Sequence, residues 1–136
     1  MMDKPKAFNY SSKNRRKFLL LAHLIISTKY RRKTLIKYGE FMKQSFVDIS
    51  MKYEFEVVEI EVDKNHIHVM IQYKPDTSIS QIVRVLKQES TIEIWKKFDL
   101  SNYYWKEKTF WGDGYFVCSV GNSSPETIQN YIKNQG

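Results

Sequence analysis

Cysteine, proline and glycine are all scarce in this chain of 136 residues, which contains one, three and five of them. Because Cys118 is alone, no disulfide forms within the chain, and a reducing compartment is expected in which this thiol is a small buried strand residue. No Pro-, Gly- or Ser-rich linker marks a boundary, so residues 1–136 are expected to form a single domain. A chain of this length buries an ordinary hydrophobic core without disulfides.

Long apolar runs are also lacking. The most apolar stretch, residues 18–26, is interrupted by His23 and is much shorter than the roughly 20 residues that cross a bilayer. Residues 1–6 are polar and do not resemble a secretory signal. We therefore expect a cytoplasmic protein without a membrane partner.

Acidic residues are almost absent from residues 1–38, which hold eleven of the 22 lysines and arginines and one acid, Asp3. Two basic clusters, residues 15–17 and 29–33, bracket the first predicted strand, and residues 1–14 are expected to form a basic, partly flexible arm. A basic run is most often a solvated surface. Tyrosines interleaved with two such runs, in a chain of net charge +7, instead favour a surface that contacts phosphates and stacks bases.

Histidine is scarce too, and two of the three histidines occur together as His66-Ile67-His68. Side chains alternate along a strand, so both imidazoles share one face while Ile67 points to the other. Residues 55–63 also alternate and are predicted to pair with the histidine strand as a hairpin that turns near residues 64–65, with its acids on the histidine side. From the pattern alone, the pair is either half of a metal site or an accident of strand alternation.

The pattern of the whole chain predicts an α+β fold. We expect strands over 18–28, 55–73 (the hairpin) and 115–120, and helices over 40–53, from Ser78 onward, and over 124–135. This order is that of a ferredoxin-like (RRM-like) antiparallel sheet with helices packed on one face. The aromatic signature of RNA-recognition modules is missing. On the second helix, the basic side chains, Lys87 among them, are expected to face solvent.

The last predicted helix carries Tyr131 and Gln135, which are four residues apart and therefore share one face. A helical tyrosine usually packs in a core, here beside Ile128 and Ile132. The pattern of this helix alone does not decide whether Tyr131 packs in the core or takes part in catalysis.

Several motifs in order along the chain do point to chemistry: the histidine pair, residues 23–32, residues 111–121 (WGDGYFVCSVG) and residues 131–135 (YIKNQ). Together they closely resemble the TnpA-type single-tyrosine transposases of bacterial and archaeal insertion sequences (the insertion-sequence 200/605 family), which belong to the HUH superfamily. The resemblance covers essentially the whole chain. It implies a prokaryotic, nucleoid-associated transposase with a single HUH domain, in which residues 124–135 form the catalytic helix.

The resemblance also implies roles for individual residues. His66, His68 and Gln135 would bind a divalent metal, Mg²⁺ or Mn²⁺, and Tyr131 would attack DNA to give a 5′-phosphotyrosine and a free 3′-OH. The expected substrate is single-stranded DNA with subterminal hairpins, and the expected assembly is a homodimer whose C-terminal helix acts in trans. Five basic residues are expected to contact hairpin phosphates: Arg15, Arg16, Lys29, Arg31 and Arg32.

Asp63 and His23 lie beside these predicted ligands or in the first predicted strand. Asp63 either orients a ligand near the metal or is a plain hairpin-turn acid, and His23 is expected to be a buried or strand-end residue rather than a ligand. Two other functions stay open. One is a domesticated HUH nuclease that acts on palindromic repeats, and the other is a ferredoxin-like single-strand-binding module without catalysis.

Overall fold

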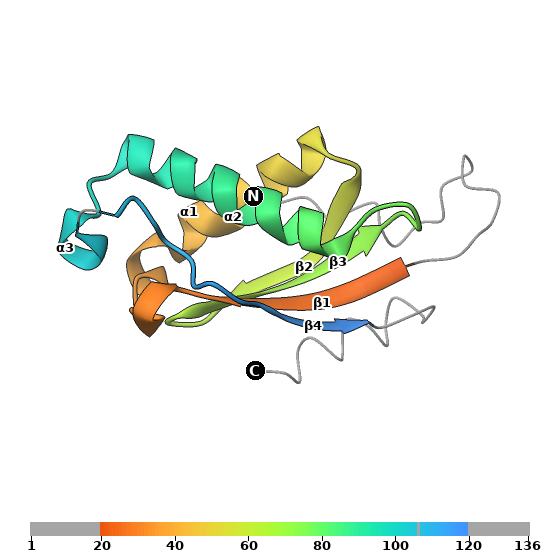
Figure 1. The fold of residues 1–136 in the computed structure, drawn as a ribbon, viewed down its shortest axis with the longest axis horizontal. Helices are drawn as coiled ribbons and strands as arrows, with labels where there is room; N and C mark the ends of the chain where they lie inside the picture. The colour runs from red at the N-terminus through yellow and green to blue at the C-terminus, as the bar shows by residue number, and fades with distance from the viewer. Residues whose placement is uncertain (1–19, 106, 120–136) are drawn as a thin grey trace.

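A computed structural model of the chain describes residues 20–105 and 107–119. They form a four-stranded antiparallel sheet with two long helices on one of its faces (Figure 1). The elements are β1 (Leu20–Ser27), the 3₁₀ turn η2 (Lys29–Arg31), α1 (Leu35–Lys52), β2 (Phe55–Val62), β3 (His66–Tyr73), α2 (Ile79–Lys97), α3 (Ser101–Tyr104) and β4 (Phe116–Ser119). The predicted arm and the predicted last helix lie outside the described residues.

The strand order β2-β3-β1-β4 places β1 and β3 in the centre of the sheet, and all three strand pairs are antiparallel. Helix α1 connects β1 with β2, helix α2 lies between β3 and β4 along the chain, and both cover the same face (Figure 1). This arrangement confirms the predicted ferredoxin-like α+β fold. In the described part of the chain, no helix is both long and apolar enough to span a bilayer.

The core lies between the sheet and the two helices. Every second residue of the central strands is buried there, and the helices contribute large side chains that are fully buried, including Met42, Phe46 and Leu86. The sheet contributes Ala22, Leu24, Ile26, Ile67, Val69 and Ile71. The alternation of buried positions is the physical reason that the opposite side chains of the same strands form a second, separate face.

Helix α1 begins at Leu35, five residues before the predicted start at 40, and that prediction is wrong. The prediction treated Gly39 as a boundary, whereas Gly39 lies inside the helix and is buried. A Cβ atom at this position would lie 2.9 Å from Cγ2 of Val62. The glycine therefore allows α1 to approach β2 closely.

The other element predictions agree better with the structure. Strands β2 and β3 form the predicted hairpin around residues 63–65, and α2 begins directly after Ser78, whose side chain accepts a hydrogen bond from the backbone N–H of Gln81. Strand β4 is short, forms one edge of the sheet and pairs with β1. Cys118 is only half-buried there, so the expectation of a buried thiol is wrong, because an edge strand has a neighbour on one side only.

Candidate active site

His66 and His68 lie on β3, on the face of the sheet opposite the helices. They stand across from Ser27 and Ile25 of β1, and their ring centroids are 4.7 Å apart. Glu61 of β2 lies across from His68, which confirms that acids of the hairpin share the histidine side. Both imidazoles are half-buried, so this face carries two metal-capable rings with limited access to water.

His66 contacts both of its near neighbours in the hairpin turn. Its Nδ1 lies 2.9 Å from Oδ1 of Asn65, and its Nε2 lies 3.5 Å from Oδ2 of Asp63. The other carboxylate oxygen of Asp63 accepts a hydrogen bond from the backbone N–H of Lys64. The backbone N–H of Asp63 closes the turn by donating to the carbonyl of His66 at 2.8 Å, and the carboxylate faces the imidazole of His66.

His68 contacts His23, the third histidine of the chain. Nδ1 of His68 lies 3.3 Å from Nε2 of His23, and the two rings are stacked with centroids 5.4 Å apart. Among the described residues, Nε2 of His68 is buried and has no hydrogen-bond partner. His23 is fully buried in the middle of β1, so the prediction of a buried residue holds.

The electrostatics keep this part of the site uncharged. Burial, and next the neighbouring His66, lower the pKa of His68. Burial, and next the nearby His68, lower the pKa of His23 to about 4. Both rings are therefore neutral at physiological pH, and a neutral imidazole is the form that ligates metals.

These observations fit a divalent ion held by His66 and His68. A buried ring nitrogen without a partner, such as Nε2 of His68, is the kind of atom that a metal satisfies. Within residues 20–105 and 107–119, no group of three His, Cys, Asp or Glu residues is placed to hold a metal. A complete site needs a further ligand, and Gln135, the predicted third one, lies outside the described residues, as does Tyr131.

The predicted DNA-contacting residues Lys29, Arg31 and Arg32 lie in and just after η2, directly beyond the end of β1 that lies across from His66. Arg31 and Arg32 are exposed. Nζ of Lys29 lies 3.1 Å from Oδ1 of Asp113, and this hydrogen bond, followed by the charge of Asp113, raises the pKa of Lys29. Arg15 and Arg16 lie outside the described residues.

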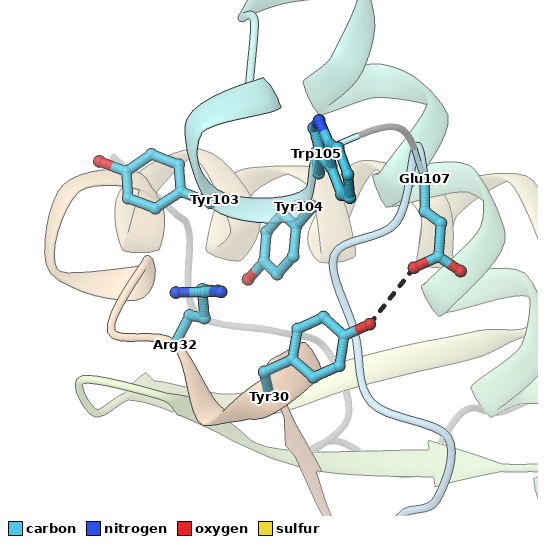
Figure 2. A pocket seen from close by; sticks show the side chains of 6 residues that line it. All are labelled: Tyr30, Arg32, Tyr103, Tyr104, Trp105 and Glu107. Atoms are coloured by element: carbon cyan, nitrogen blue, oxygen red, sulfur yellow. Dashed lines mark hydrogen bonds between the residues drawn. The ribbon is translucent and has the colours of Figure 1, made fainter.

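A pocket of about 370 Å³ adjoins this basic turn (Figure 2). Six side chains line it: Tyr30, Arg32, Tyr103, Tyr104, Trp105 and Glu107. Tyr30 and Trp105 are 63% and 76% exposed, which is unusual for rings of this size. The hydroxyl of Tyr30 donates to Glu107 at 3.3 Å, and the guanidinium of Arg32 lies 5.7 Å from the centroid of the Tyr30 ring.

The backbone at this pocket is unusual as well. Tyr30, Arg31 and Trp105 have φ values of 58°, 52° and 50°, in the left-handed region that residues with side chains rarely adopt. The sequence marks Tyr30 within a basic run and marks residues 103–111 only as rich in aromatics. It gives no sign that the two segments meet, because about 70 residues separate them along the chain.

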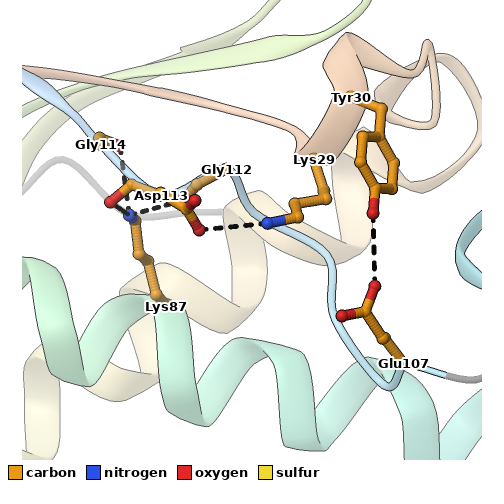
Figure 3. A network of polar contacts seen from close by, with 7 residues as sticks. All are labelled: Lys29, Tyr30, Lys87, Glu107, Gly112, Asp113 and Gly114. Carbon is orange, nitrogen blue, oxygen red and sulfur yellow. Dashed lines mark hydrogen bonds and ion pairs between the residues drawn. The ribbon is translucent and has the colours of Figure 1, made fainter.

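Lys87 anchors the loop that leads into β4 (Figure 3). Its Nζ donates to the backbone carbonyls of Gly112, Asp113 and Gly114 at 2.7, 3.1 and 3.1 Å. The side chain is half-buried, and burial lowers its pKa. The prediction that Lys87 faces solvent is therefore wrong. The reason is that its acceptors are main-chain oxygens, which no side-chain pattern reveals.

The same loop is tied to the end of β1. The backbone N–H of Gly112 donates to the carbonyl of Ser27 at 2.7 Å, and Thr28 forms a bridge with Trp111. The ion pair between Lys29 and Asp113 lies beside these contacts (Figure 3). The loop therefore joins the basic turn, helix α2 and the start of β4.

Comparison with known proteins agrees with this geometry. The family model described as "Transposase IS200 like" matches residues 16–135. The transposase for insertion sequence element IS200 of Salmonella typhimurium is 29% identical over 116 residues, which are 83% of this chain and 74% of that protein. The ISDra2 transposase TnpA of Deinococcus radiodurans is 28% identical over 115 residues, which are 83% of this chain and 81% of that protein.

Two solved structures share the fold. A crystal structure of a Deinococcus radiodurans protein described as a transposase has a TM-score of 0.69 and 30% identity, with 87% of this chain and 92% of that chain covered. The structure of a REP-associated tyrosine transposase bound to a REP hairpin has a TM-score of 0.61 and 14% identity, with 90% of this chain and 68% of that chain covered.

Proposed function

The chain belongs to the family of IS200-like transposases, and on that basis we propose that it cuts and rejoins single-stranded DNA at the ends of an insertion sequence. The proposed substrate is a single strand that folds into hairpins near those ends. The likeness in fold to a tyrosine transposase bound to a hairpin supports this substrate. The proposed assembly is a homodimer in which the C-terminal helix of one subunit completes the site of the other.

The observation that carries the proposal is the pair His66 and His68. Both rings are half-buried on the face of the sheet opposite the helices, and Nε2 of His68 is buried with no hydrogen-bond partner among the described residues. These two side chains, with Gln135, would hold Mg²⁺ or Mn²⁺. When bound, such an ion polarises the scissile phosphate and favours the negative charge that develops on it.

Tyr131 is the proposed nucleophile. Its phenolic oxygen gives up its proton and forms a bond to phosphorus while the bond between phosphorus and the 3′ oxygen breaks, and one proton is taken up by the departing oxygen, which becomes a free 3′-OH. One phosphodiester replaces another, so the step needs no ATP and the reverse attack rejoins strands. The ordinary pKa of a tyrosine, about 10, makes it a weak nucleophile at neutral pH. The reaction would therefore depend on a metal that polarises the phosphate under attack.

The basic turn and the aromatic pocket are the proposed DNA-binding surface. Arg31 and Arg32, with Arg15, Arg16 and Lys29, contact phosphates, and the exposed rings of Tyr30 and Trp105 stack on unpaired bases. Left-handed backbone at Tyr30 and Trp105 supports a functional role, because such strain persists where function requires it. Substituting Trp105→Ala is expected to weaken binding of a single strand by about 1–3 kcal/mol, measured by fluorescence anisotropy.

The deciding experiment incubates the protein with single-stranded DNA that carries hairpin element ends, in the presence of Mn²⁺ or Mg²⁺. We expect a protein–DNA adduct that resists denaturation and is absent from Tyr131→Phe and from His66→Ala. Tyr53→Phe is the matched control, because Tyr53 follows the far end of α1 and this variant should form the adduct normally. An undiminished adduct in Tyr131→Phe would remove the assignment of the nucleophile.

A second candidate function is a domesticated nuclease that acts on palindromic repeats. The likeness in fold to the REP-associated tyrosine transposase bound to a REP hairpin favours this candidate. The same assay separates the candidates when repeat hairpins and element ends are offered in parallel. An adduct with repeat hairpins alone supports the nuclease. Tight binding without an adduct on any hairpin supports a binding module without catalysis.

A further inference from the structure

The two histidines of β3 use their ring nitrogens in the same way. Each has its Nδ1 against a neighbour: Oδ1 of Asn65 at 2.9 Å for His66, and Nε2 of His23 at 3.3 Å for His68. Each therefore leaves Nε2 as the nitrogen that is available to a metal. For His66 this atom faces Asp63, and for His68 it is buried without a hydrogen-bond partner among the described residues.

A neutral imidazole has one N–H and one nitrogen with a free lone pair, and only the latter binds a metal. The amide oxygen of Asn65 can only accept, so the contact with His66 places a hydrogen on Nδ1 and leaves Nε2 as the nitrogen that can bind a metal. The contact between His68 and His23 allows two arrangements, because either ring is able to donate. Only donation by Nδ1 of His68 leaves its Nε2 able to bind a metal.

We propose that His23 is a positioning residue: its Nε2 accepts the Nδ1–H of His68 and thereby holds His68 in the tautomer and orientation that bind the divalent ion. Asn65 has the same role for His66. The proposal rests on the metal site of the proposed function and extends it to residues that are not ligands. Hydrogen bonds of this kind to the second ring nitrogen orient metal-binding histidines in many proteins.

The surroundings of His23 suit this role. His23 lies on the central strand β1, between Met70 of β3 and Cys118 of β4, and its side chain is fully buried. A central strand with hydrogen bonds on both sides holds the backbone of His23 in place, and its ring lies at an interplanar angle of 26° to that of His68. With its Nε2 turned to His68, His23 is not itself a ligand of the same ion through that atom.

The test compares two substitutions at this position. His23→Gln keeps a side-chain oxygen that can accept a hydrogen bond, whereas His23→Leu keeps the volume but has no acceptor. Mn²⁺ affinity, measured by electron paramagnetic resonance of free Mn²⁺, is expected to fall about 10- to 100-fold in His23→Leu and to recover largely in His23→Gln. Cys118→Ala is the matched control on the same face, directly across from His23, and should bind Mn²⁺ as the wild type does.

A second readout needs neither metal nor activity. The ¹⁵N shifts of His68 in the metal-free protein report which ring nitrogen carries the hydrogen, and we expect Nδ1 in the wild type and a mixture of tautomers in a folded His23→Leu variant. A wild-type His68 protonated on Nε2, or equal Mn²⁺ affinity in His23→Leu and wild type, would overturn the role of His23 alone. If the wild type and His66→Ala bind Mn²⁺ equally poorly, the proposed metal site itself fails and this role fails with it.

Discussion

On β3, Ile67 and Val69 face the helices, while His66 and His68, between and beside them, face the other way. The helix-covered face is apolar, and its buried side chains are stabilised by packing against the helices. The histidine face holds rings, carboxylates and a buried nitrogen, Nε2 of His68, that has no hydrogen-bond partner among the described residues. One strand therefore contributes to stability with one set of side chains and offers chemistry with the other.

The largest effect should come from the helix-covered face. Substituting Ile67→Ala removes a fully buried side chain between the two histidines and is expected to lower the free energy of unfolding by about 2–5 kcal/mol, measured by urea denaturation. Ile36→Ala is the matched control, because Ile36 is 68% exposed and the change should cost little. Similar losses of stability in both variants would contradict the view that burial on the helix-covered face makes Ile67 important for stability.

The histidine face should respond to metal instead. If His66 and His68 bind Mn²⁺, a concentration of 100 times the dissociation constant stabilises the folded protein by about 2.7 kcal/mol, and adding a chelator reverses the gain. His66→Ala should lose this response while Ile67→Ala keeps it, although Ile67→Ala is the less stable protein. Thermal melts with and without Mn²⁺ measure the response, and a gain that persists in His66→Ala contradicts the comparison.

A smaller effect tests how closely the helix layer approaches the sheet. Gly39→Ala should destabilise the protein by about 1–3 kcal/mol, because the new Cβ would lie 2.9 Å from Cγ2 of Val62. The gain of about 1 kcal/mol that alanine brings over glycine within a helix offsets part of this cost. In the double variant with Val62→Ala the clash should disappear, and chemical denaturation of both variants gives the coupling energy. A stabilised Gly39→Ala variant would show that the close approach is not needed.

Much of this organisation follows from periodic patterns that the sequence displays. Alternation along residues 55–73 predicts the hairpin, its two faces and the side on which the acids lie, because side chains on a strand repeat every two residues. Ser78 marks the start of α2 through a local hydrogen bond. These features depend on near neighbours in the chain, and for that reason they were predictable.

The features that escaped prediction all depend on distant neighbours. Gly39 was predicted to mark a helix boundary, because the sequence does not show that Val62 lies against it. Lys87 was predicted to face solvent, because the sequence does not show that the carbonyl of Gly112 accepts its hydrogen bond. The aromatic pocket and the contact between His23 and His68 likewise join segments far apart in sequence. For the catalytic roles of Tyr131 and Gln135, which the resemblance implies, the test is biochemical.

Lys87 has a mechanical consequence for the two faces. Its ammonium group is fixed to three carbonyls of the loop that leads into β4, and β4 lies next to the strand that carries His23. Two further hydrogen bonds join α2 to the same segment, from Nε1 of Trp95 to the carbonyl of Thr109 and from Nε1 of Trp111 to Oγ of Ser90. A change in the position of α2 is therefore expected to change the position of the loop and of β4, which forms the edge of the histidine face.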